Sequence, residues 1–94
     1  MSEEKSLKDL IFSMMDSYHL SDKLVETRVR NEWEVLMGKT IAKNTSRLSI
    51  HKKTLYLELS SAPLKNDLYY HEQTIVEKVN QYIGQQVIHQ IKIK

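Results

Sequence analysis

Hydrophobic residues recur along this chain at two spacings, and the change between them separates helices from strands. A spacing of three or four predicts a helix over residues 7–18, with its first turn capped by Ser6 and an apolar face made of Leu7, Leu10, Ile11, Met14 and Tyr18. A second helix is expected to begin at Ser21, which is placed to cap it, and to bury Val25, Val29, Trp33, Leu36 and Met37. Both helices would therefore pack one side against a core.

Gly38 is expected to end the second helix, because glycine accepts the left-handed conformation that commonly closes helices. A further short turn at Ile41 and Ala42 would follow it. From Arg47 the spacing falls to two, and two strands are predicted, over residues 47–51 and 55–59. Their connection lacks the glycine or asparagine of a tight primed turn, so we expect a looser hairpin turn that includes Thr54.

The remaining pattern predicts one helix and one strand. Pro63 suits the first turn of a helix, which should run to about Ile83 and be capped by Gly84. Residues 87–93 are predicted to form a third strand, with one face made of Val87, His89, Ile91 and Ile93. The fold class is α+β in the order α-α-β-β-α-β, with helices packed on one face of a three-stranded sheet. The open face would then carry Arg47, Ser49, His51, Tyr56, Glu58, Lys92 and Lys94.

Composition limits the class of protein. A length of 94 residues allows one small domain, which we divide into an N-terminal helical extension at 1–19 and a compact domain at 20–94. Hydrophobic residues make up 40% and charged residues 28%, as in ordinary soluble domains. Without cysteine, the chain forms no disulfide and no thiolate metal site. Its polar N-terminus and the lack of a long apolar run predict a cytoplasmic protein without a membrane segment.

The positive charge is concentrated near the middle of the chain. The formal net charge is only +2, but residues 38–53 contain five basic residues and no acidic one. Such a run can contact nucleic-acid phosphates, or it can be a solvated surface with no ligand. Tyr56 on the open face could stack a base or lie half-buried among its cross-strand neighbours. The candidate nucleic-acid-binding residues are Lys39, Lys43, Arg47, Lys52, Lys53 and Tyr56.

Catalytic chemistry has little support in the sequence. The histidines at 19, 51, 71 and 89 lie on separate predicted elements and show no metal-ligand spacing. Two glycines cannot form a phosphate-binding loop, and no serine lies in a nucleophile motif. We therefore expect no enzyme activity, no cofactor, no metal and no small-molecule substrate.

The order and spacing of several residues resemble the DciA family. The resemblance covers residues 20–94 and rests on Trp33, Gly38, Ile41-Ala42, Thr45, the run Leu55-x-Leu57-x-Leu59-Ser60-Ser61, Leu64, Leu68, Asn80 and Gly84. It implies a KH-like domain that binds single-stranded or duplex DNA and contacts the bacterial replicative helicase as a loader. The chain departs from KH domains in lacking their GxxG loop. The alternative function is a protein-interaction module that docks an acidic partner surface without nucleic acid.

Overall fold

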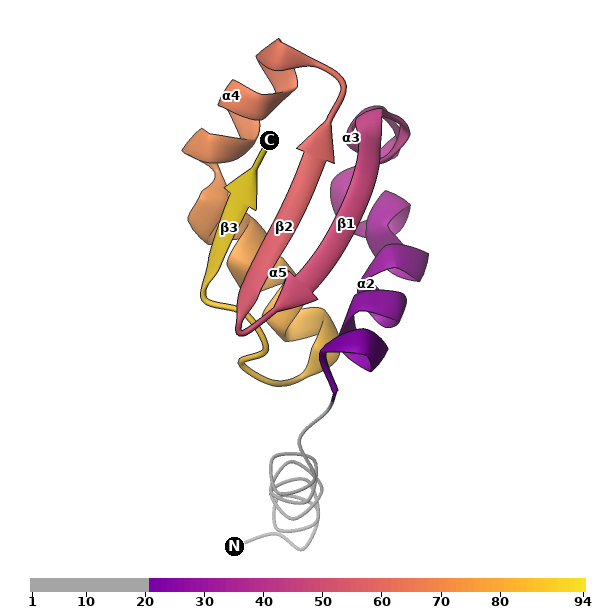
Figure 1. Cartoon of the computed structure of the whole chain (residues 1–94), viewed down its shortest axis with the longest axis vertical. Helices are drawn as coiled ribbons and strands as arrows, with labels where there is room; N and C mark the ends of the chain where they lie inside the picture. The colour runs from indigo at the N-terminus through magenta and orange to yellow at the C-terminus, as the bar shows by residue number, and fades with distance from the viewer. Residues whose placement is uncertain (1–20) are drawn as a thin grey trace, which may run out of the picture.

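A computed structural model describes residues 21–94, which form four helices and a three-stranded sheet (Figure 1). The predicted helix over residues 7–18 lies outside the described residues. The elements in chain order are α2 (Asp22–Met37), α3 (Lys39–Asn44), β1 (Thr45–His51), β2 (Thr54–Leu59), α4 (Ala62–Tyr70), α5 (Glu72–Ile83) and β3 (Gln90–Ile93). The predicted α+β class, with helices packed on the sheet, is confirmed.

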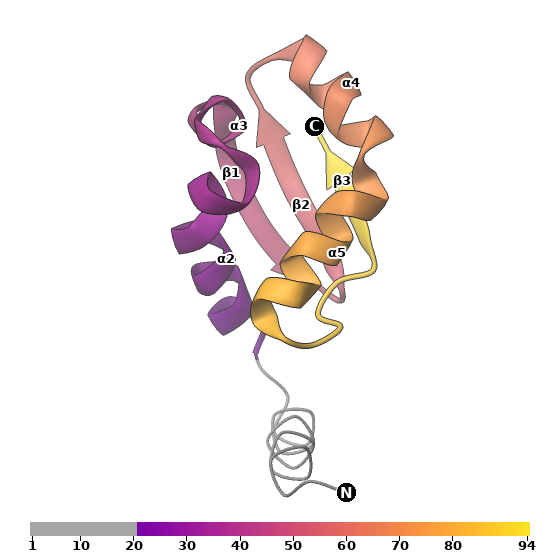
Figure 2. The same cartoon turned by 180° about the vertical axis from the view of Figure 1, so that it is seen from behind.

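The sheet has the strand order β1-β2-β3. β1 and β2 pair antiparallel with Leu48 opposite Leu57, whereas β2 and β3 pair parallel with Leu55 opposite Ile91. Helix α5 lies behind the strands in Figure 1 and in front of them in Figure 2, while α2 and α4 flank the two edges. The opposite face of the sheet has no helix across it within the described part of the chain.

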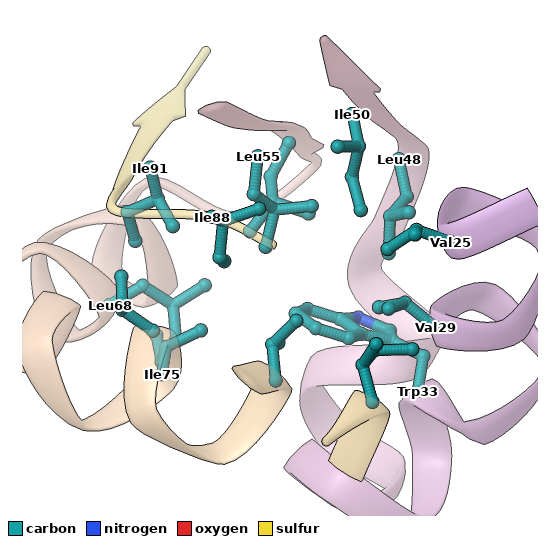
Figure 3. Close-up of a cluster of buried hydrophobic side chains, with 14 of the residues drawn as sticks. Val25, Val29, Trp33, Leu48, Ile50, Leu55, Leu68, Ile75, Ile88 and Ile91 are labelled. Carbon is teal, nitrogen blue, oxygen red and sulfur yellow. The ribbon is translucent and has the colours of Figure 1, made fainter. Parts of the chain in front are cut away.

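One apolar core lies between the sheet and the helices. The alternate residues of β1 and β2 that face the helices are buried, and Leu55 has no exposed surface. Figure 3 shows Val25, Val29 and Trp33 of α2 on one side of this core and Leu68 and Ile75 on the other. The predicted α2 face is thus confirmed at these three positions, while Leu36 and Met37 are only partly buried at its end.

Both ends of α2 form as the sequence predicts, with one difference in geometry. The Ser21 hydroxyl accepts a hydrogen bond from the Leu24 amide at 3.1 Å. Gly38 ends the helix, but with φ 89° and ψ 165° instead of the expected left-handed helical conformation. This region is open almost only to glycine. A Cβ at this position would meet no atom within 4 Å, so the need for glycine comes from the backbone torsions alone.

The helix predicted from Pro63 to Ile83 is wrong in one respect, because the chain breaks at His71 into α4 and α5. The His71 amide donates to the Leu68 carbonyl at 3.1 Å. The Asp67 carbonyl, its partner in a continuous helix, instead lies 2.8 Å from the Nδ1 atom of the His71 ring. The side chain thus takes the place of the backbone donor, and the next residue starts a new helix.

The predicted third strand is also too long, since β3 begins at Gln90 and residues 87–89 form a loop. Buried Asn80 holds this loop: its Oδ1 accepts from the Val87 and Ile88 amides at 2.9 and 3.0 Å, and its Nδ2 donates to the Ile88 carbonyl at 2.9 Å. Backbone groups bonded to a side chain cannot join a strand ladder. Ile88 is consequently the residue buried here, while His89 is exposed.

Three polar residues of α2 bond in succession to the outer edge of β1. Asp22 accepts from the Lys52 amide at 3.2 Å, just beyond the end of the strand. Glu26 accepts from the Ile50 amide at 3.2 Å, and Arg30 donates to the Leu48 carbonyl at 3.0 Å. Four residues along a helix advance about 6.0 Å and two along a strand about 6.8 Å, so the two periods nearly match. We call Asp22, Glu26 and Arg30 the edge ladder.

Glu26 is the charged centre of the edge ladder. Its side chain is 11% exposed, and its Oε2 lies 2.7 Å from Arg30 Nη2. The hydrogen bond from Arg30 lowers the pKa of Glu26 against the opposing effect of burial, and the Ile50 amide and the Lys23 charge lower it further. A carboxylate so stabilised contributes to folding only while it is ionised.

We expect Glu26→Gln to destabilise the domain at neutral pH by about 1–2 kcal/mol, because an amide keeps an acceptor for Ile50 but loses the charge. The ordinary pKa is 4.5 and the folded value is lower. The difference between wild type and variant should therefore be full above pH 4.5 and shrink as the pH falls through the folded value. Urea unfolding from pH 7 to pH 3 measures this. The exposed Glu77→Gln is the control, and a pH-independent difference would contradict the assignment.

Candidate nucleic-acid interface

The first two predicted residues lie on α3, directly after Gly38. Lys39 and Lys43 are four residues apart on this six-residue helix, so they share one side, and both are exposed. A chain of bonds fixes α3 against its neighbours: Trp33 Nε1 donates to Thr45 Oγ1 at 3.0 Å, and that hydroxyl donates to the Ile41 carbonyl at 2.6 Å. The expected short turn at Ile41 is thus confirmed as a helix with two outward lysines.

Arg47 lies on β1, on the open face of the sheet. Its side chain is 77% exposed, and its Nε lies 3.5 Å from the Glu58 carboxylate on β2. The two residues are direct cross-strand partners. Part of the Arg47 charge is therefore neutralised within the protein, whereas the α3 lysines form no ion pair with any residue from 21 to 94.

Lys52 and Lys53 form the whole turn between β1 and β2, and the looser turn predicted from the sequence is wrong. Thr54 is the first residue of β2 and pairs with His51, leaving a two-residue connection. Both lysines have positive φ, 48° and 62°, as a primed type I′ turn requires. Tertiary bonds hold them: Asp22 accepts from the Lys52 amide, and the Lys53 carbonyl accepts from the His89 amide at 2.9 Å.

The structure separates these basic residues into two groups. Lys39 and Lys43 lie where β1 begins, and the Lys52-Lys53 turn lies where it ends, as Figure 1 shows. Seven strand residues span about 20 Å, so the two groups are about one strand length apart. Arg47 lies between them, nearer α3. The five predicted basic residues thus lie in a line along β1. We call this line the basic stripe; it consists of Lys39, Lys43, Arg47, Lys52 and Lys53.

Tyr56 lies in the middle of the open sheet face, with Ser49 and Lys92 as its partners on the adjacent strands. Its exposed fraction of 38% leaves part of the ring accessible. A groove of about 680 Å³ runs over this part of the sheet toward α4 and includes Tyr69, which is not among the nucleic-acid-binding residues predicted from the sequence. No spacing along the chain relates Tyr69 to β2. Its position depends on how α4 packs beside the sheet.

The three histidines within residues 21–94 lie apart from one another. His51, His71 and His89 lie at the end of β1, between α4 and α5, and before β3, while His19 is outside the described residues. His51 Nδ1 is 3.8 Å from Asp22, at the end of the edge ladder. In residues 21–94, no three His, Asp or Glu side chains gather as a metal-binding group. Over the same residues, no helix has the length and apolar character needed to cross a membrane.

The fold and the exposed cations define a small α+β domain with a polar, partly basic sheet face. The family model described as Dna[CI] antecedent, DciA, matches residues 6–93, so the chain belongs to the DciA family. No curated protein and no solved structure is significantly similar to the chain. The division at residues 19 and 20 and the KH-like topology remain predictions.

The turn sequence offers a test of backbone strain. We expect the double substitution Lys52→Asn, Lys53→Gly to stabilise the domain by about 1–2 kcal/mol, because these residues adopt positive φ more readily than lysine does. Urea unfolding followed by Trp33 fluorescence measures the change. Lys52→Gln with Lys53→Gln is the matched control: it removes the same charges, keeps the strain and should leave stability near wild type. Equal stabilisation by both variants would show charge repulsion as the cause.

Proposed function

We propose that this protein is a non-enzymatic DNA-binding adaptor that acts with the replicative helicase as a loader. The observation that carries the helicase part is the family match over residues 6–93. DNA binding is assigned to the basic stripe, with Lys39, Lys43, Arg47, Lys52 and Lys53 contacting phosphates and Tyr56 contacting a base. The structure supports this assignment through the position of the cations and the strain at the turn.

The dimensions of the basic stripe suit a nucleic-acid backbone. Phosphates along one strand of a duplex advance about 3.4 Å each, so the roughly 20 Å between α3 and the turn corresponds to about six phosphates. One bound strand could therefore contact Lys39 and Lys53 together. Neither end of the stripe carries an ion pair with a carboxylate among residues 21–94.

The strained turn is the second support. Asparagine-glycine is favoured in a type I′ turn, yet this chain holds two lysines there at positive φ. Unfavourable backbone conformations are commonly retained where a function requires the side chains. At the tip of the hairpin both lysines are exposed, and the Lys53 ammonium, which donates to the Gln86 carbonyl at 3.2 Å, keeps two further donors for a phosphate.

Titration of a labelled single-stranded oligonucleotide at several salt concentrations tests DNA binding. We expect measurable affinity at low salt, and a reduction of the salt dependence by roughly two when Lys39, Lys43 and Arg47 become Ala, since each lost phosphate contact contributes about 0.7 for single strands. The control replaces Lys65 and Lys78 with Gln, outside the stripe. No binding at low salt, or an unchanged slope, would refute the stripe.

The alternative is a protein-interaction module whose basic stripe meets an acidic partner. The Arg47–Glu58 pair is consistent with it, because it shows that this guanidinium binds a carboxylate, the group that an acidic partner surface would offer. Co-purification with the replicative helicase under nuclease treatment separates the two functions. Retention of the helicase shows direct protein contact, whereas its loss shows a DNA bridge.

A further inference from the structure

The open face of the sheet contains a groove that the basic stripe only borders. Its walls come from all three strands, from α4 and from the first residue of α5, and it includes Tyr56, Tyr69, Lys92 and Lys94. This is the face toward the viewer in Figure 1, away from α5. Resting on the proposed DNA binding, we propose that this groove is a base-stacking site for an unpaired nucleotide, with Tyr69 beside Tyr56 as the stacking surface and Lys92 as the phosphate contact.

Two aromatic rings line the groove and remain accessible. Tyr56 is 38% exposed on the sheet, and Tyr69 is 53% exposed on α4. Tyr70, the next residue, is 87% exposed but does not line the groove. Aromatic side chains with accessible faces stack nucleobases irrespective of their sequence. Tyr69 and Tyr56 line the same groove from different elements, so one base could contact both rings.

The side chains that line the groove carry one more positive than negative charge, with Arg47, Lys92 and Lys94 against Glu58 and Glu72. Glu58 is engaged by Arg47 at 3.5 Å, and Glu72 accepts from the Ile91 amide at 3.0 Å. Lys92 and Lys94 have no ion pair with any of the described residues. Lys92 is the direct parallel-strand neighbour of Tyr56. An aromatic surface therefore lies next to an uncompensated ammonium, which matches a base and its phosphate.

The same geometry selects single strands over duplex. Bases inside a duplex are stacked on one another and paired, so their faces cannot reach a tyrosine ring. A single strand can turn one base into the groove while its neighbouring phosphates follow the basic stripe across Arg47, which borders both. The groove would thus add affinity for unpaired DNA, while the stripe contacts phosphates in either form.

The test compares adjacent tyrosines by fluorescence anisotropy with a labelled oligothymidine and with the same label on a duplex. Tyr69→Ala should weaken single-strand binding roughly five- to 150-fold, the range for losing one stacked base, and leave duplex binding unchanged. Its salt slope should stay at the wild-type value, because no phosphate contact is lost. Tyr70→Ala is the matched control and should behave as wild type. Both positions are exposed on a helix, where alanine is well tolerated.

Two further variants assign the roles within the groove. Lys92→Gln should lower the single-strand salt slope by about 0.7, whereas Lys78→Gln on α5 should not. Tyr56→Val, which keeps a strand-forming residue, should also weaken single-strand binding selectively. Single-strand binding by Tyr56→Val that is as tight as that of wild type would show that Tyr56 is not part of the stacking surface, and would overturn the inference.

The inference and the proposed function can fail separately. If Tyr69→Ala binds single strands as tightly as Tyr70→Ala, the stacking site is wrong even when the basic stripe variants lose binding. If wild type binds neither form of DNA at low salt, the proposed function itself fails. Circular dichroism of each variant establishes that the comparison is between folded proteins.

Discussion

The edge ladder between α2 and β1 is the interaction on which the rest of this fold depends. A small sheet exposes the unpaired backbone groups of its outer strands, which invite other chains to pair. Here a helix supplies the missing partners through side chains, and the nearly equal advance of four helical and two strand residues allows the pattern to repeat. The bonds at Glu26 and Arg30 also fix the position of α2 along β1. In this position Val25, Val29 and Trp33 are buried in the core.

The sequence predicted the parts of the fold that depend on local periodicity. The buried face of α2, the caps at Ser21 and Gly84 and the two alternating strands follow from spacing and residue type alone. Three features could not be predicted from hydrophobic spacing, because particular hydrogen bonds decide them. Asn80 draws residues 87 and 88 out of the expected strand, a ring nitrogen at His71 divides a helix, and Asp22 with His89 holds a turn that its own two residues disfavour.

In the candidate site, too, some features could be predicted from the sequence and others depend on the fold. Charge clustering identified the basic residues, and all five are exposed, but their spacing along the chain does not predict two groups at opposite ends of β1. The pairing of Arg47 with Glu58 needs the strand register. Tyr69 joins the sheet face only through the packing of α4, since it lies thirteen positions after Tyr56, on a different element. Composition thus locates charge along the chain, whereas the fold decides which charges and rings share a surface.

Trp33 gives the protein a built-in optical reporter. It is the single tryptophan of the chain, it is 4% exposed, and its indole nitrogen bonds to the hydroxyl that joins α3 to β1. Its emission therefore depends on the junction that carries Lys39 and Lys43, and only indirectly on the distant hairpin. Any event that loosens α3 would shift this signal without global unfolding, so the motion of one end of the molecule can be followed without an added label.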